Sequence, residues 1–220
     1  TGEFDAITGN ATGSNIYGYK SVPIISLASL PSTALTVGTK TLQKFTVSAN
    51  EAGDVSWKQI VFDVSKTKDV LLVGCATGAG NCTNLSLYAG SDKIAGSMTA
   101  SVDFSSAATN ATITFIPTDE EIIPAGQSKT YELRANVTGA VTSGNYIVSK
   151  IVKYEHGDKT ENTASAALDT ITAGDSNIQE NFIWSDMSAQ SHSDATTDWA
   201  GDFLVKNLTT DTQTLSGSGS

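Results

Sequence analysis

Residues 41–64, TLQKFTVSANEAGDVSWKQIVFDV, contain two stretches in which apolar and polar side chains alternate, separated by the turn sequence EAGD at 51–54. Phe45 and Val47 share one face of the first stretch, and Ile60 and Phe62 share one face of the second. A two-residue period is typical of strands that bury one face and expose the other. These residues therefore predict two β-strands joined by a turn.

The same alternation recurs along most of the chain. Further strands are predicted at 21–30, 70–73, 84–88, 97–104, 112–117, 130–137, 146–153, 181–184 and 203–208. About ten to twelve short strands separated by turn residues predict an all-β fold, an antiparallel β-sandwich. The predicted core consists of Phe45, Val47, Ile60, Phe62, Val64, Tyr131, Leu133, Phe182 and Trp184.

The predicted domain organisation is simple. Residues 1–19 are rich in Gly, Asn and Thr and are interpreted as a linker or N-terminal arm. One sandwich domain is expected at 20–214, and whether 156–214 forms a separate subdomain stays open. Residues 215–220, LSGSGS, are interpreted as a flexible linker or a cloning remnant.

The composition excludes several classes of function. The 220 residues carry a net charge of −10 and include a single arginine, Arg134. Without a basic excess the chain offers no footprint for nucleic acid or for anionic membranes. No apolar run approaches 18 residues, so we expect no membrane insertion.

Two cysteines, Cys75 and Cys82, enclose six small residues. A disulfide would close this loop and stabilise the fold by about 2–3 kcal/mol. Free thiols or a metal pair are the alternatives, but two thiolates do not complete a zinc site. The disulfide interpretation predicts an oxidising compartment, outside the cell or at its surface.

Catalysis requires a nucleophile with a base, paired carboxylates or a metal. The two histidines, His156 and His192, lie in polar loop sequences and are interpreted as solvated side chains. Because serines are abundant, a Ser–His–Asp set could be assembled on paper without meaning. We therefore expect no enzyme activity and no cofactor.

Carboxylates and aromatic residues supply the candidate binding sites. Asp119, Glu120 and Glu121, and separately Asp194 with Asp198, are weak candidates for calcium, whose ligands are six to eight oxygens. Solvated acidic turns are the alternative. An exposed Trp199 between Asp198 and Asp202 is the best candidate for stacking on a glycan, whereas Trp57 and Trp184 are expected in strands and in the core.

Two kinds of covalent modification have sequence signals in the chain. Sequons occur at Asn10, Asn81, Asn84, Asn110, Asn136 and Asn207, which we interpret as a by-product of the Ser/Thr-rich composition. An intramolecular Lys–Asn crosslink needs buried partners. Lys44, Lys58 and Lys150 are expected on outward faces, which argues against it.

Three groups of residues carry a family resemblance. They are 35–64; 123–126 followed by 130–133; and 181–186 followed by 191–193 and 198–199. Together they resemble immunoglobulin-like modules of large secreted or cell-surface proteins of uncultivated candidate-phyla bacteria. The resemblance covers most of residues 20–215 and transfers no site residue.

The resemblance implies an immunoglobulin-like β-sandwich that acts as a structural or adhesive module: a stalk, a repeat unit or a surface-assembly subunit. Expected partners are neighbouring modules or copies of the chain, met by strand addition through residues 1–19. A carbohydrate-binding or calcium-dependent adhesive module is the alternative.

Overall fold

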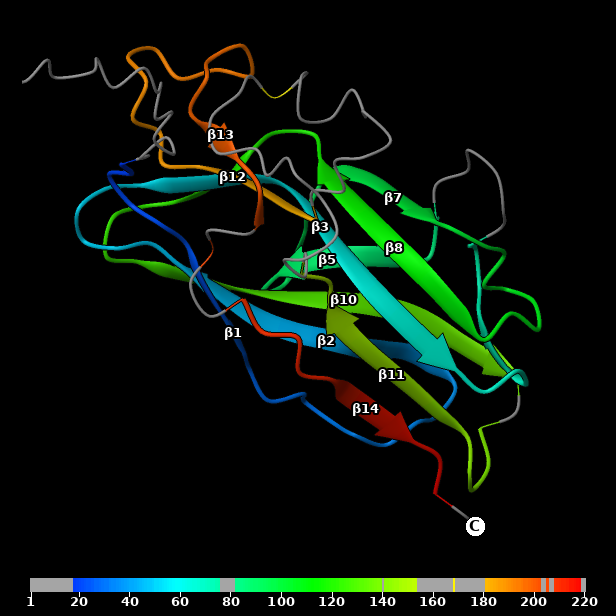
Figure 1. Cartoon of the computed structure of the whole chain (residues 1–220). Helices are drawn as coiled ribbons and strands as arrows, with labels where there is room; N and C mark the ends of the chain where they lie inside the picture. Colours follow the sequence, from blue (N-terminus) through cyan, green and yellow to red (C-terminus); the bar gives the residue numbers. More distant parts are fainter. Residues whose placement is uncertain are drawn as a thin grey trace, which may run out of the picture.

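The computed structural model describes residues 18–75, 82–139, 141–153, 168, 181–202, 205 and 208–218. These residues form two antiparallel sheets packed face to face (Figure 1). The predicted antiparallel β-sandwich is thus confirmed. The described residues contain fourteen strands, against the ten to twelve predicted, because several strands are only two or three residues long.

The first sheet, called sheet A, has six strands; five follow the order β1-β2-β10-β5-β6, and the sixth, β4, pairs with β10 next to β5. The strands of sheet A are β1 (Ile24–Leu27), β2 (Gly38–Ser48), β4 (Val70–Leu72), β5 (Leu85–Ala89), β6 (Asp92–Lys93) and β10 (Ser128–Gly139). The long strand β10 is the organising element, because it pairs with β2 along one edge and with β4 and β5 along the other.

The second sheet, sheet B, is built around β3, whose two edges pair with four strands. On one edge lie β8 and β9, and on the other lie β11 and β12. The strands of sheet B are β3 (Val55–Lys66), β7 (Gly96–Ala100), β8 (Asn110–Pro117), β9 (Glu121–Ile123), β11 (Tyr146–Ile151), β12 (Phe182–Ser185), β13 (Trp199–Ala200) and β14 (Gln213–Ser216).

The core lies between the sheets and confirms the two-residue period. All nine residues predicted to form it are buried. Trp57 occupies its centre, with its ring centroid 5.3 Å from that of Tyr131 and 6.0 Å from that of Phe182. Burying such rings removes about 150–250 Å² each from water, so these aromatic side chains contribute strongly to the apolar stabilisation of the fold.

The structure corrects the predicted ends of the sandwich. Tyr19, assigned to the arm, packs on Trp184 with a centroid distance of 5.1 Å. At the other end β14 runs to Ser216 and buries Leu215, where a flexible segment was predicted. The predicted strand at 203–208 lies mostly outside the described residues; Val205 and Leu208, which are described, are buried but not in a strand.

Candidate functional site

A loop and a short strand cover part of the outer face of sheet B. We call residues 186–200 the cap. The cap is held by a second apolar cluster, made of Leu168, Ile183 and Trp199. Ile183 belongs to β12, but it faces away from the core, since its neighbours Phe182 and Trp184 belong to the main cluster.

His192 lies in the cap between two carboxylates. Its Nδ1 is 2.8 Å from Asp198 Oδ2, and its Nε2 is 2.9 Å from Glu120 Oε2. Glu120 belongs to the turn between β8 and β9, so the imidazole connects the cap to the sheet. The side chains of His192 and Asp198 are 8% and 6% exposed. The prediction that His192 is a solvated loop residue is therefore wrong.

The two hydrogen bonds decide the charge of the ring. A carboxylate only accepts, and an imidazole donates from both nitrogens only when it is protonated. Burial disfavours the imidazolium, but the hydrogen bonds and charges of Glu120 and Asp198 outweigh burial and raise the pKa of His192. The geometry and the pKa shift both describe an imidazolium shared by two carboxylates.

Asp198 accepts further hydrogen bonds from donors within the cap. Burial alone would raise its pKa, but hydrogen bonds from the Thr196 hydroxyl (2.5 Å) and the Ala189 amide (3.2 Å) and the charge of His192 lower it. Ser185 also donates to Asp198, over 3.1 Å. The carboxylate thus ties β12 and three parts of the cap together.

This cluster does not have the geometry of a nucleophilic triad. In such a triad the serine hydroxyl donates to the histidine, and the acid orients the histidine. Here the Ser185 hydroxyl contacts the acid, and the second nitrogen of His192 faces Glu120. The arrangement fastens the cap to the sheet.

The cap backbone carries strain at two positions. Met187 has φ 50° and Ser191 has φ 62°, which is the left-handed region that L-residues other than Gly, Asn and Asp adopt at a cost. The Met187 amide donates to Ser185 Oγ over 2.9 Å. Local hydrogen bonds of this kind hold the strained turn in place.

The acidic turn offered for calcium is occupied by protein groups. Glu120 pairs with His192, and Glu121 forms an ion pair with Lys129 and accepts a hydrogen bond of 3.1 Å from the Tyr131 hydroxyl. Burial, followed by the charge of Glu121, raises the pKa of Tyr131, so its hydroxyl stays protonated. Within the described ranges, no group of three or more His, Cys, Asp or Glu side chains is arranged to hold a metal ion.

The residues proposed for glycan stacking are placed differently from expectation. Trp199 was expected in an exposed loop, but its side chain is fully buried and its indole Nε1 donates to Ser193 O over 3.0 Å. Its ring centroid lies 5.0 Å from that of His192. A ring buried on both faces cannot stack on a sugar, so this expectation is wrong. Asp198 and Asp202 are near Trp199 in the chain but are also buried.

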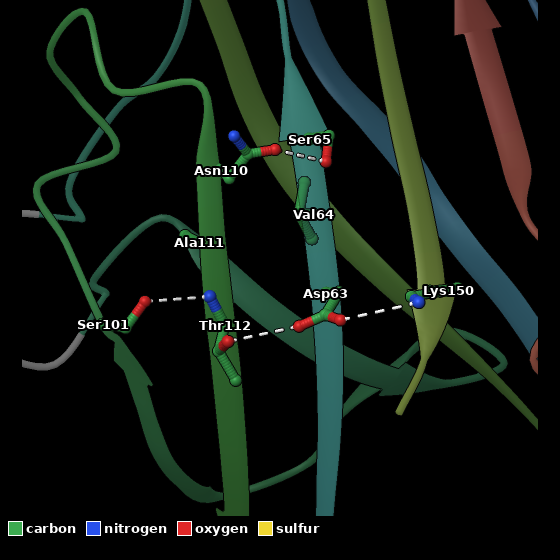
Figure 2. A pocket seen from close by; sticks show the side chains of 8 residues that line it. All are labelled: Asp63, Val64, Ser65, Ser101, Asn110, Ala111, Thr112 and Lys150. Atoms are coloured by element: carbon green, nitrogen blue, oxygen red, sulfur yellow. Dashed lines mark hydrogen bonds and ion pairs between the residues drawn. The ribbon is translucent and has the colours of Figure 1, made fainter. Parts of the chain in front are cut away.

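A polar hollow of about 340 Å³ lies on the outer face of sheet B. Figure 2 shows side chains from β3, β8 and β11 around it. Asp63 accepts a hydrogen bond of 3.1 Å from Thr112 and lies 3.8 Å from Lys150 Nζ. Nearby, Ser65 donates to Asn110 over 2.7 Å. The hollow therefore offers hydroxyl, amide, carboxylate and ammonium groups side by side.

The predicted disulfide is present between Cys75 and Cys82. Both cysteines are buried and belong to the main core cluster. The Cys82 amide donates to Met98 O of β7, and the Phe104 amide donates to Cys75 O. The bridge thus anchors the loop between β4 and β5 to the β7 side of the sandwich.

Sequence reasoning missed a buried lysine, Lys66. Its side chain is fully buried, its Nζ donates to Ser106 O over 3.0 Å and lies 5.0 Å from the centroid of the Phe104 ring. Burial lowers its pKa, although Asp103 and Asp69 oppose this effect. The signal was available, because residue 66 continues the inward series 60, 62 and 64.

The other named positions divide between exposed and undescribed. The crosslink candidates Lys44 and Lys150 are partly exposed, with side-chain values of 26% and 44%. Lys58 and the sequon at Asn136 are also partly exposed, and the sequons at Asn84 and Asn110 are exposed. His156 and the sequons at Asn10, Asn81 and Asn207 lie outside the described residues.

Comparison with known proteins identifies no family for the chain. No family model matches the chain, and no curated protein matches it. Among solved structures, the chain is similar to the collagen-binding domain of a Staphylococcus aureus adhesin, with 14% identity and a TM-score of 0.23. The match covers 67% of this chain and 91% of that domain. In the part of the chain that the structure describes, no helix has the length and apolarity needed to cross a membrane.

Proposed function

We propose that the chain is a non-catalytic structural or adhesive module of an extracellular or cell-surface protein, placed in series within a longer assembly. The observation that carries this proposal is the position of the two ends of the sandwich. The first described residues lie beside β12, whereas β14 leaves the sandwich at the opposite end (Figure 1).

Contacts fix both ends. At the first end, Tyr19 packs against Trp184 with tilted rings, and the Lys20 amide donates to Asp186 over 2.7 Å. At the far end, the Gly217 amide donates to Asn145 O over 2.8 Å. A β-carbon on Gly217 would lie 2.1 Å from Thr142 O, so only glycine fits this exit. A chain that enters and leaves at opposite ends suits a spacer that adds its length to a stalk.

The disulfide supports the location. Cystine bridges persist in oxidising compartments and are rare in the cytosol. The bridge closes a short loop, so it stabilises the module without constraining how the ends are presented.

Tandem copies joined through the chain's own ends test the proposal. Small-angle scattering should show that each added copy increases the maximum dimension by about one module length. Two copies with Cys75→Ser and Cys82→Ser serve as a control for stability. Copies that fold back into a compact pair would contradict the stalk.

A second candidate function, glycan binding, is favoured by the polar hollow rather than by Trp199. Hydroxyl, amide and charged groups gathered in one concavity suit the hydroxyls of a sugar. A glycan array should then give signals that Thr112→Ala and Asp63→Asn abolish. Thr39→Ala, at an exposed position of β2, is the matched control. An array without signals would remove this candidate.

Strand addition between copies is the proposed mode of self-association. β1 is an edge strand of sheet A with an exposed Ile24, and residues 1–17, which would supply the added strand, lie outside the described residues. Deleting residues 1–17 keeps the Tyr19 contact and should give a folded monomer by sedimentation. A monomeric full-length chain would contradict this mode.

A further inference from the structure

The last strand of the sandwich, β14, makes backbone hydrogen bonds along both of its edges. Along one edge, β14 pairs with β11 from Tyr146↔Ser216 to Ser149↔Gln213. Along the other edge, residues 33–35 run parallel to it: the Leu35 amide donates to Ser216 O, and the Ser216 amide donates to Thr33 O, both over 2.9 Å. β14 is therefore not an open edge, although it is the last strand in the order of sheet B.

The side chain of Gln213 adds a second attachment, to sheet A. Its Nε2 donates to Ala28 O over 2.7 Å, and its Oε1 accepts from the Lys44 amide over 2.6 Å. Ala28 follows β1, and Lys44 belongs to β2. Between these two residues the backbone makes one hydrogen bond, from the Ala28 amide to Lys44 O over 3.0 Å. The Gln213 amide completes the pairing that the two backbones leave open.

These contacts connect the segments next to both ends of the sandwich. Residues 28–35 follow β1 directly, and β14 precedes the exit at Gly217. Figure 1 shows residues 28–35 and β14 running side by side toward the exit. Tension between the two ends would pull β14 toward the exit and β1 toward the opposite end.

The force that β14 resists depends on whether the tension acts along the strand or across it. Hydrogen bonds between antiparallel strands, such as β14 and β11, are perpendicular to the strand axis, and those between parallel segments, such as β14 and residues 33–35, are slanted across it. A pull along β14 therefore loads the bonds to β11, to residues 33–35 and to Gln213 together, in shear. Bonds loaded together must break in one event, whereas a pull across the strands would open them one after another.

We propose that β14, held between β11 and residues 28–35 and pinned by the Gln213 amide, is a mechanical clamp that resists tension along the module. We call this arrangement the β14 clamp. The inference rests on the proposed placement of the module in series, because only then do the two ends carry opposite forces.

Single-molecule force spectroscopy on the full chain, held by its two ends, tests the β14 clamp. Gln213→Ala removes both side-chain hydrogen bonds, and Gln213→Glu keeps the acceptor for Lys44 while losing the donor to Ala28. Thr214→Ala, at an exposed position of the same strand, is the matched control. Each hydrogen bond of this type contributes enough that losing two should raise the unfolding rate at constant force about 10-fold or more.

We expect Gln213→Ala to unfold fastest, Gln213→Glu at an intermediate rate and Thr214→Ala at the rate of the unmodified chain. Equal rates for all four proteins would overturn the clamp. If Gln213→Ala does not fold, Gln213→Glu against Thr214→Ala decides the question. Gradual extension of the unmodified chain at low force, without one cooperative event, would also overturn it. Failure here leaves the tandem scattering result unaffected, so the two proposals fail separately.

Discussion

The sandwich core and the cap are both centred on a buried tryptophan, but they are held together in different ways. Trp57 is surrounded by Tyr131, Phe115 and Phe182 between two sheets. Among the described residues, Trp199 shares an apolar cluster with Leu168 and Ile183 and lies beside the polar network around His192. The core depends on buried area, which is insensitive to pH. The cap depends on a few charged contacts, whose strength changes with pH.

The largest expected effect is on the core. Trp57→Ala removes the central ring and leaves the Tyr131 hydroxyl without its donor at 3.3 Å. We expect the free energy of unfolding to fall by about 3–5 kcal/mol, as for other buried aromatic residues. Urea denaturation followed by circular dichroism measures it. If Trp57→Ala lowered the free energy of unfolding less than Trp199→Ala does, the core would contribute less to stability than the cap, contrary to this prediction.

Trp199→Ala should affect the cap more than the sandwich. Removing a buried indole from the smaller cluster should cost the cap about 2–3 kcal/mol. Hydrogen exchange should show faster exchange at residues 186–200, while β10 keeps its protection, since local openings need not follow global unfolding. Equal loss of protection in both regions would show that the cap and the core unfold together.

The pH dependence separates the two regions further. The pKa of His192 is raised in the folded state, so its contribution is complete below the unfolded value of about 6.5 and is lost as pH rises through the higher folded pKa. The pKa of Asp198 is lowered, so its contribution is complete above about 3.8 and is lost on acidification. The cap should be most stable between about pH 4 and 6.5.

His192→Gln tests this dependence. The variant should lose about 1–2 kcal/mol of cap stability near pH 5.5, since a hydrogen-bonded charge is removed. Above pH 8 the difference from the unmodified chain should shrink. Hydrogen exchange of the cap as a function of pH measures the loss near pH 5.5 and its decrease above pH 8. Trp57→Ala is the control, because it should leave the pH dependence of cap exchange unchanged. A pH-independent difference would mean that the imidazole acts by shape alone.

The smallest expected effect concerns the strained turn. Ser191→Gly relieves a positive φ and should stabilise the cap by about 0.5–1 kcal/mol, because glycine adopts this conformation without a steric penalty. Thermal melts compared with Ser188→Gly, which has no such φ, isolate the backbone effect. Destabilisation by Ser191→Gly would show that the serine side chain matters more than the strain.

The same contrast explains what could be predicted from the sequence. Periodicity identified the inward faces of β3, β10 and β12, because a strand that borders a core must alternate. Periodicity could not identify β13 or the burial of Trp199, since the cap covers the outer face of β12, where alternation predicts solvent. Nor could it identify the contact of His192 with Glu120, because the two residues are 72 positions apart.

β14 was missed for a related reason. Its four residues include one buried apolar side chain, Leu215, and its partners are supplied by distant segments, β11 and residues 33–35. The glycines and serines that follow resemble a flexible tail. A strand of this kind forms because of the segments that pair with it, and a single sequence does not show which distant segments these are.

The buried Lys66 can report when the segment that covers it opens. Its ammonium group is enclosed by the segment that contains Phe104 and Ser106, at the end of β3. Amine-reactive reagents should modify the exposed lysines at once and reach this nitrogen only when that segment swings away. The rate of acylation at position 66, followed by mass spectrometry, would therefore measure how often this segment opens.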